Sequence, residues 1–317
     1  MSPKYFIPSP PVVQLGFNID TFIYISLLTI FSPVFVWLEV YLGIVSVQSA
    51  LILDSLWVLR TLNLCYKTAY KSDKESKVVL ITGGSNGLGF RIVQTLQNDR
   101  SISKIQVIDL HPHAQFSSMS KVEFIKFDFN QEIEELVSML DLNSIDVLIC
   151  NAGIRQTNTI SKLPVSKIKS IINVNWLNHL LLIQQYVRVE NTKKHLVFIG
   201  SLLGFVGPTK LGVYAATKSA ILSIGDSLRE ELPSSTTVSV ILPGQMNTQM
   251  FADVQVNEFL APVIDASLLS ERICSIINDN LNGTFSYPTY GRFLPVYRVL
   301  PWGLQKFCRW FSGMDNV

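Results

Sequence analysis

A glycine-rich turn between a strand-like run and a helical run constrains the fold of this 317-residue chain more than any other feature. Residues 77–82 (KVVLIT) are rich in β-branched residues, and residues 83–89 (GGSNGLG) follow at once. Apolar residues then recur at helical spacing, at Leu88, Ile92, Val93 and Leu96. In this order the glycines let the backbone approach a pyrophosphate, and the helix start supplies N–H groups. The pattern predicts a nucleotide-binding turn, and the lack of a following Lys-Ser/Thr pair disfavours a P-loop ATPase.

Strand and helix patterns alternate along the rest of the chain. Strands are predicted at residues 104–109, 122–127, 146–150, 195–199 and 237–242, with helices at residues 130–142 and 168–187. This alternation predicts an α/β fold, a Rossmann-type doubly wound parallel sheet that binds its ligands at the carboxyl ends of the strands.

Asp109 ends the second predicted strand, about 20 residues after the last glycine of the turn. A carboxylate there hydrogen-bonds the hydroxyls of an adenosine ribose and repels a 2′-phosphate. Asn86 leaves the glycine turn without a basic residue. The sequence therefore favours NAD over NADP as the cofactor.

Tyr214 and Lys218 place a phenol and an ammonium four residues apart. On a helix these two positions share one face, and a neighbouring ammonium lowers the pKa of a phenol from about 10. Such a phenol gives or takes a proton at an alcohol or carbonyl group. The pair alone is a weak signal, and Ser201, after the strand at 195–199, strengthens it.

These features together resemble the short-chain dehydrogenase/reductase family. The resemblance rests on TGGSNGLG at 82–89, Asp128 after the third strand, CNAG at 150–153, and Ser201, Tyr214 and Lys218. It covers about residues 77–290, and Cys150 stands where a second Asn is common. The apolar N-terminus and the style of the motifs look like the membrane-anchored retinol and hydroxysteroid dehydrogenase branch.

The resemblance implies four catalytic residues. Tyr214 is expected to be the general acid/base, and Lys218 to lower the pKa of Tyr214 and bind the nicotinamide ribose. Ser201 is expected to hold the substrate oxygen, and Asn175 to hold a water in a proton relay to solvent. Asn173 competes with Asn175, which we prefer as the second Asn of the N-V-N run.

The resemblance also implies which residues lie at the cofactor. At the pyrophosphate we expect Gly83, Ser85, Asn86, Gly87, Leu88 and Gly89, and beside the adenosine Asp109 and Asp128. Toward the nicotinamide we expect Asn151, Ala152, Gly153, Tyr214, Lys218, Pro243, Gly244, Met246 and Thr248. His111 and His113 are interpreted as ordinary loop or surface residues, and no metal site is indicated.

The N-terminal extension, residues 1–76, contains two apolar runs. Residues 21–38 carry no charge, and residues 40–59 are interrupted only by Asp54. About 20 apolar residues cross a bilayer as a helix, so these runs predict a membrane anchor, with Pro33 as a kink in the first. A hairpin, one tilted span, and one span plus an interfacial helix all remain open, as does a buried core helix.

Basic residues follow the apolar part and place the catalytic domain in the cytosol by the positive-inside rule. They are Arg60, Lys67, Lys71, Lys74 and Lys77. We expect the membrane to be that of the endoplasmic reticulum or a lipid droplet.

Two later segments add to this interpretation. Residues 249–266 occupy the usual position of a substrate lid, and Phe251, Phe259, Leu260 and Pro262 suggest an apolar substrate. The tail, residues 291–317, interleaves aromatic and basic residues, as an interfacial helix does; packing on its own domain or in a dimer is the alternative.

The predicted divisions are therefore 1–76, 77–290 and 291–317.

The predicted function is hydride transfer between NAD(P) and the alcohol or carbonyl of a lipophilic retinoid-, steroid- or fatty-type substrate. The alternatives are an NADPH-dependent lipid-biosynthetic ketoreductase and a non-catalytic membrane scaffold. The net charge of +2 does not favour nucleic acid as a partner, and a homodimer is possible.

Overall fold

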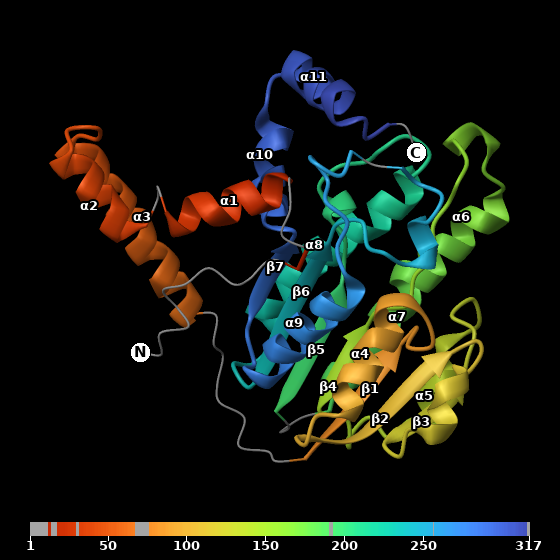
Figure 1. Ribbon diagram of the computed structural model, residues 1–317. Coiled ribbons are helices and arrows are strands. Elements are labelled where there is room, and N and C mark those ends of the chain that lie inside the picture. Colours follow the sequence, from red (N-terminus) through yellow and green to blue (C-terminus); the bar gives the residue numbers. More distant parts are fainter. Residues whose placement is uncertain are drawn as a thin grey trace.

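The computed structural model describes residues 12–13, 18–29, 32–66, 76–189, 193–255 and 257–315. These residues form one seven-stranded sheet in the order β3-β2-β1-β4-β5-β6-β7, with every neighbouring pair parallel (Figure 1). The strands are β1 Lys77–Thr82, β2 Ile102–Asp109, β3 Val122–Lys126, β4 Val147–Cys150, β5 Lys194–Ile199, β6 Thr236–Pro243 and β7 Gly283–Tyr287. This is the α/β, Rossmann-type sheet that the sequence predicts.

The strand order reverses between β1 and β4. The chain runs from β1 outward through β2 to β3 and then returns to β4 on the other side of β1. At such a switch point the loops after the two central strands diverge and leave a crevice, where ligands of doubly wound sheets bind. The glycine turn after β1 and residues 151–153 after β4 border this crevice.

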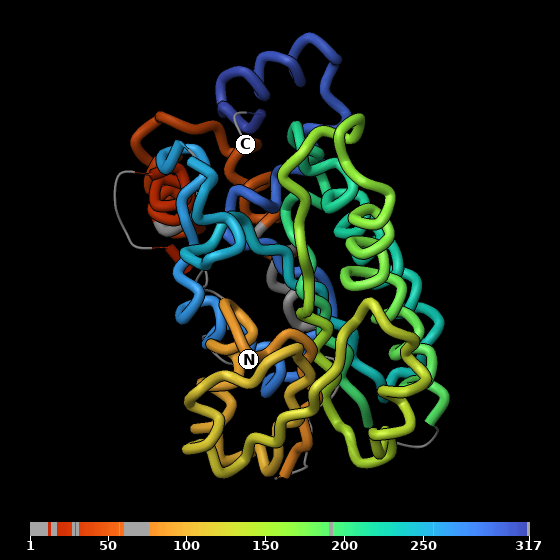
Figure 2. The backbone as a smooth tube through the Cα atoms, turned by 90° about the vertical axis from the view of Figure 1, so that its right-hand side faces the viewer, coloured from red at the N-terminus to blue at the C-terminus, as the bar shows by residue number. Residues whose placement is uncertain are grey.

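Helices cover both faces of the sheet (Figures 1 and 2). On one face lie α4 Gly87–Gln97 and α9 Ala266–Asn278, and on the other lie α5 Ile133–Met139, α6 Val165–Ile172, α7 Asn178–Val187 and α8 Gly212–Glu231. Side chains of alternate strand positions enter one or the other layer of core. Val79 and Ile81 pack toward α4, while Leu80 packs on the opposite side. Alternation with both faces buried explains why these strands are apolar throughout.

Several element boundaries differ from those predicted. The helix predicted at 168–187 is divided into α6, a π-helical turn Asn173–Leu177 and α7. The helix predicted at 130–142 is only α5, and β3 ends before Asp128. The edge strand β7 was not predicted, because its GTFSY sequence has little apolar alternation to distinguish it from a loop.

The N-terminal extension folds into α1 Ile19–Leu28, α2 Pro33–Tyr41 and α3 Val47–Tyr66. Pro33 does not kink a helix: it occupies the first turn of α2, whose N-cap Ser32 accepts a hydrogen bond from the Phe35 N–H. Glu39 lies inside α2, so the turn between the apolar runs follows α2. Within the part of the chain that the structure describes, no helix is both long and apolar enough to cross a bilayer. Lys67, Lys71 and Lys74 and the side chain of Arg60 lie outside the described residues.

This extension also packs against the catalytic domain. Val12 and Val13 belong to the core layer beneath α9. The Ile19 N–H donates to the Phe259 carbonyl at 2.8 Å, and Asp20 accepts from the Tyr290 N–H at 3.1 Å. Figure 2 shows α1 beside the chain segment that contains Phe259. The division at residue 76 remains a prediction, but α1 is held by the domain that follows it.

The chain ends in three short helical segments, η7 Thr289–Phe293, α10 Leu294–Val299 and α11 Trp302–Ser312. They lie at the end of the molecule to which the strands point (Figure 1).

The contact of α8 with β6 provides a test of the packing. A Cβ at Gly225 would lie 2.4 Å from the Val240 Cγ2, whereas a Cβ at Gly212, in the first turn of the same helix, would meet nothing within 4 Å. We expect Gly225→Ala to lower the free energy of unfolding by about 1–3 kcal/mol, because an overfilled core must shift. Gly212→Ala is the matched control and should be neutral or slightly stabilising. Urea unfolding midpoints of both variants measure the effect, and equal midpoints would contradict this packing.

Candidate active site

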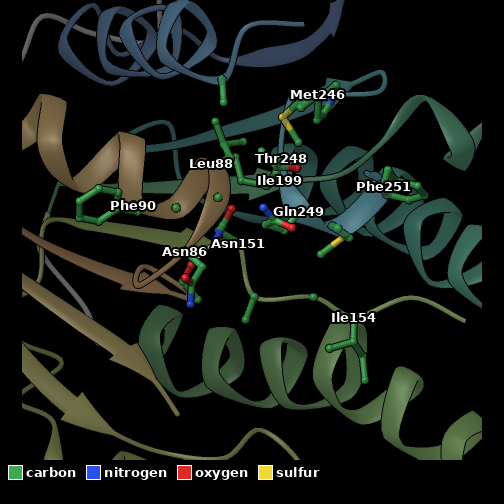
Figure 3. Close-up of a pocket in the computed structure, with 18 of the residues that line it drawn as sticks. Asn86, Leu88, Phe90, Asn151, Ile154, Ile199, Met246, Thr248, Gln249 and Phe251 are labelled. Carbon is green, nitrogen blue, oxygen red and sulfur yellow. Dashed lines mark hydrogen bonds between the residues drawn. The ribbon is translucent and has the colours of Figure 1, made fainter. Parts of the chain in front are cut away.

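A cavity of about 910 Å³ opens at the carboxyl ends of the strands (Figure 3). Every residue predicted for the cofactor lines it except Ser85. Three of the four predicted catalytic residues, Ser201, Tyr214 and Lys218, line it as well. The structure therefore brings the glycine turn and the Tyr-Lys pair to one site.

The glycine turn approaches the rest of the site closely enough to exclude side chains. A Cβ at Gly89 would lie 2.1 Å from the Gly83 carbonyl oxygen and 2.6 Å from the Asn151 Nδ2. Gly83 and Gly87 have φ of 65° and 54°, which L-residues rarely adopt. The N-cap of α4, Asn86, makes no side-chain cap, so the first N–H groups of α4 are left for a bound anion.

Asp109 connects the end of β2 to this turn. Its carboxylate accepts from the Ser85 N–H at 2.9 Å and from the Leu110 N–H at 2.8 Å. Ser85 itself lies behind the turn, and its buried hydroxyl has no partner among the described residues. Asp109 therefore shapes the turn in addition to presenting charge to the cavity.

His113 lines the cavity and stacks on Phe90, with ring centroids 3.6 Å apart. His113 is a loop residue, as interpreted, and the loop places it at the cavity. Phe90 and His113 come from different elements, α4 and the loop after β2, so spacing along the chain could not pair them.

Thr82 and Asn151 join the ends of β1 and β4. The Thr82 hydroxyl accepts from the N–H groups of Asn151 and Ala152, each at 3.0 Å. The Asn151 side chain donates to the Thr82 and Gly83 carbonyls at 3.0 and 2.8 Å. The His179 Nε2 lies 2.8 Å from the same hydroxyl, and burial lowers the His179 pKa to about 4, so this ring is neutral. The network closes the floor of the cavity.

The Tyr-Lys pair lies on one face of α8, as predicted. The Lys218 Nζ is 5.6 Å from the centroid of the Tyr214 ring and donates to the Ile199 carbonyl at 2.8 Å. Ser201 forms a side-chain hydrogen bond with Tyr214. Both members of the pair are almost fully buried.

The expected direction of the Tyr214 pKa shift was wrong. Burial raises the Tyr214 pKa to about 12, against the Ser201 hydrogen bond and the charge of Arg155, which lower it. Burial likewise lowers the Lys218 pKa to about 8. For two buried groups, the cost of removing each charge from water exceeds the attraction that the i, i+4 spacing suggests.

Asn175 lies beside the cavity in the π-helical turn. Its Oδ1 accepts from the Ile154 N–H at 2.8 Å, and its Nδ2 donates to the Ile154 carbonyl at 2.9 Å and to the Thr217 hydroxyl at 3.2 Å. Both amide hydrogens are therefore used inside the protein. The side chain holds the segment after β4 against α8, and a water relay through it would have only the second lone pair of Oδ1.

Gln156 is a functional candidate that sequence reasoning missed. Its buried Oε1 accepts from the N–H groups of Val213 and Tyr214, at 2.9 and 3.1 Å. These are orphan donors at the start of α8, where Leu211, the N-cap residue, offers no side-chain acceptor. Gln156 thus fixes the helix turn that carries Tyr214. The missing local cap was the only signal in the sequence.

Arg155 fastens the segment expected to be the lid. It forms an ion pair with Asp253 and lies 4.8 Å from the centroid of the Phe251 ring. Phe251 in turn packs edge-on against Tyr214, with ring centroids 5.8 Å apart. Phe259, also expected in the lid, contacts Phe22 of α1 instead.

Comparisons with known proteins agree with this geometry. A family model described as short chain dehydrogenase matches residues 77–258. The uncharacterized oxidoreductase TDA5 of Saccharomyces cerevisiae is 31% identical over 262 residues, which are 78% of this chain and 80% of TDA5. The 3-oxoacyl-acyl-carrier-protein reductase FabG of Escherichia coli is 28% identical over 186 residues, 56% of this chain and 76% of FabG. A solved 4-hydroxyisoleucine dehydrogenase complexed with NADH superposes with a TM-score of 0.60 at 20% identity, covering 67% of this chain and 96% of that one.

Burial of Lys218 makes stability depend on pH. Because its pKa falls from 10.5 to about 8, the native state binds fewer protons than the unfolded state between these values. The cost of burying the ammonium is fully present below pH 8 and disappears as the pH rises toward 10.5. Relative to wild type, Lys218→Met should therefore lose stability with rising pH, by up to about 1.4 kcal/mol per pH unit.

The difference between the two proteins isolates Lys218, because both keep every other buried lysine. Chemical denaturation at a series of pH values from 7 to 9.5 measures it, with Lys162→Met on the exposed η3 turn Ile160–Lys162 as control. A gap that is the same at every pH would show that Lys218 is not desolvated.

Proposed function

Because the chain belongs to the short-chain dehydrogenase family, we propose that it interconverts the alcohol and carbonyl forms of a lipophilic substrate with NAD as its preferred cofactor, at a membrane surface. The chain is an oxidoreductase of that family and uses NAD(P). The observation that carries the proposal is the convergence of the glycine turn, Ser201, Tyr214 and Lys218 on one cavity.

The residues present fit a dinucleotide. The glycine turn is a cradle that a Cβ at Gly89 would fill, and the uncapped start of α4 suits a pyrophosphate. Asp109 and Asp128 would lie at the adenosine, and Thr248 beside Gly87 would help to close the site. Bound in this cavity, the nicotinamide supplies or accepts the hydride.

The protein supplies the proton and the orientation. Tyr214, with its raised pKa, is a neutral phenol at physiological pH, the form that donates a proton to a carbonyl oxygen. Ser201 hydrogen-bonds Tyr214 and would hold the same substrate oxygen. Lys218 adds a positive charge beneath the ring, which stabilises the phenolate left after proton transfer.

The cavity wall supports an apolar substrate. Ile154, Val174, Met250 and Phe251 line it, and Phe251 contacts the Tyr214 ring directly. Apolar walls with a few convergent polar groups are typical of sites for small lipophilic molecules. A retinoid, steroid or fatty-type alcohol fits this description, as in the membrane-anchored branch that the sequence resembles.

The N-terminal helices support anchoring by a hairpin in one leaflet. The Trp37 Nε1 of α2 donates to Asp54 of α3 at 2.6 Å, and Glu39 of α2 is half-buried. Most of the large apolar side chains of the two helices are exposed, Tyr41, Ile52 and Leu59 among them. The nine residues of α2 are ~14 Å long, about the depth of one leaflet of a ~30 Å core. Such a hairpin would hold the domain on the cytosolic face of the endoplasmic reticulum or a lipid droplet.

A second candidate is a ketoreductase of lipid biosynthesis that uses NADPH. FabG, a relative over 56% of the chain, is named a 3-oxoacyl reductase. Arg91 lines the cavity and offers the cation that a 2′-phosphate requires. The two candidates differ in cofactor and in substrate class.

Replacing Tyr214 tests the proposed chemistry. We expect Tyr214→Phe to lower turnover about 10²–10⁴-fold, because it removes the proton donor, and to leave the Kd for NADH unchanged. Dodecanal, retinal and a 3-oxoacyl thioester, each with NADH and with NADPH, are the probe substrates. Tyr24→Phe in α1 is the control. If Tyr214→Phe turns over any of these substrates as fast as the wild type does, the proposed mechanism is wrong. If the wild type binds neither NADH nor NADPH, the assignment as an oxidoreductase is wrong.

Replacing Asp109 tests the cofactor preference. Asp109→Asn removes the charge that repels a 2′-phosphate while keeping one acceptor for the turn. The ratio of NADPH to NADH affinity should rise about tenfold, or about 1.4 kcal/mol. Asp128→Asn, at the same cavity, should leave the ratio unchanged. Fluorescence titration measures both, and a wild-type preference for NADPH would favour the ketoreductase.

A further inference from the structure

Helix α11 is packed with its polar side toward the protein and its apolar side toward solvent. Gln305, Cys308, Arg309 and Ser312 are half-buried on the inner side. The outer side consists of large apolar residues with high exposed fractions, Trp302 73%, Leu304 51%, Phe307 55%, Trp310 76% and Phe311 58%. A helix on the surface of a soluble domain has the opposite orientation.

The segment that precedes α11 also exposes large apolar residues. Phe293, Val296 and Val299 are also exposed. We name the outer residues of these segments, Phe293, Val296, Val299, Trp302, Leu304, Phe307, Trp310 and Phe311, the α10–α11 face. Large exposed apolar side chains gathered on one short stretch of chain mark a site of interaction.

The segment that carries the face is basic: Arg292, Arg298 and Lys306 are exposed, whereas Arg309 lies on the inner side and is paired with Asp315. Residues 283–314 contain four basic residues and no Asp or Glu; they are Arg292, Arg298, Lys306 and Arg309. The Lys306 Nζ lies 5.3 Å from the centroid of the Trp302 ring, so a cation and an aromatic ring sit together at the surface. Tryptophan, phenylalanine and lysine in this arrangement suit the headgroup region of an anionic bilayer.

A second copy of this chain is a poorer occupant. In a twofold interface the same patch faces itself, so the exposed basic residues of one copy would approach those of the other. Residues 283–314 contain no acidic residue that would compensate that repulsion, and Asp315 is already paired with Arg309 and Thr209. An anionic lipid surface supplies the missing charge.

Polar contacts on the inner side connect α11 to the active site. Arg309 donates to Asp315 at 2.8 Å and to the Gly207 carbonyl at 3.1 Å. Asp315 accepts from both the N–H and the hydroxyl of Thr209, at 2.9 Å each. The loop at residues 205–211 is therefore clamped by the C-terminal helix.

This loop runs between two residues of the catalytic site. It begins after Ser201 and its 3₁₀ turn Leu202–Gly204, and it ends where α8 begins, two residues before Tyr214. Its conformation is demanding, since Lys210 has a positive φ of 63°. A change in the position of α11 would reach Ser201 and Tyr214 through this loop.

We propose that the α10–α11 face docks on an anionic lipid bilayer and that docking orders the loop 205–211 through the Arg309–Asp315–Thr209 contacts. The proposal builds on the membrane location proposed above and adds the regulation of the same site by the lipid. Docking of this face requires no membrane-spanning helix and does not depend on the N-terminal hairpin. Every variant in the test keeps that hairpin unchanged.

The docking test uses the full chain and vesicles of phosphatidylcholine with phosphatidylserine. We expect the double variant Trp302→Ser/Trp310→Ser to bind at least about tenfold more weakly, because two large side chains no longer enter the lipid. The control is Ile160→Ser/Val165→Ser, which removes two apolar residues of similar exposed fraction elsewhere. Retained NADH affinity shows that each variant is folded. Equal vesicle binding by the two double variants would overturn the proposed docking. The proposal would also be overturned if the wild type forms a dimer in solution and only Trp302→Ser/Trp310→Ser is monomeric, because the face would then bind a second copy of the chain.

The coupling test uses hydrogen exchange of residues 205–211. Vesicles should slow exchange in this loop several-fold in the wild type and should have no effect on it in Asp315→Ala, which keeps the α10–α11 face and therefore its vesicle binding. An unchanged loop in the vesicle-bound wild type overturns the coupling. NADH binding and the Tyr214→Phe comparison are measured without vesicles, so a failure of the proposed function is recognised separately.

Discussion

The bond network between Thr82 and Asn151 is the constraint on which the site depends. The crevice of a doubly wound sheet exists because the chain segments after β1 and β4 run in opposite directions. For the same reason, the hydrogen bonds that pair β1 with β4 do not extend to Thr82 and Asn151. One hydroxyl and one amide replace them, and the Thr82 hydroxyl accepts two N–H groups at 3.0 Å each. The glycine turn is thereby fixed relative to β4, and with it the surface on which a pyrophosphate would lie.

Burial governs the chemistry of the Tyr214 and Lys218 pair. Burial makes a charge on either group costly, so the Tyr214 pKa rises and the Lys218 pKa falls. The groups that position the pair act through the backbone: Gln156 holds the first turn of α8, and Asn175 holds the segment after β4. A rigid scaffold of this kind keeps a proton donor aimed at one point while the substrate varies.

The two ends of the chain share a second principle, an inverted arrangement of polar and apolar side chains. Asp54 of α3 accepts from Trp37 of α2, and in α11 Gln305, Arg309 and Ser312 are half-buried on the inner side. Each arrangement satisfies polar groups inside the protein and leaves apolar surface for an environment other than water. The same contacts that produce this inversion in α11 reach the loop beside Tyr214, so the outer surface and the active site are parts of one structure.

The sequence alone determined the sheet, the glycine turn and the Tyr-Lys spacing, because these depend on short-range patterns: β-branched runs, glycine at positive φ, and helical periodicity. Of the seventeen residues that it predicted for the cofactor, sixteen line the cavity, and Ser85 is the exception. Only the tertiary structure decided what Gln156, Arg155 and His113 do, since each acts on a residue of a different element. It also decided the sign of the Tyr214 pKa shift and that the side of α11 with Trp310 is exposed. Both depend on burial, which is a property of the whole fold and cannot be calculated from the spacing of residues along one helix.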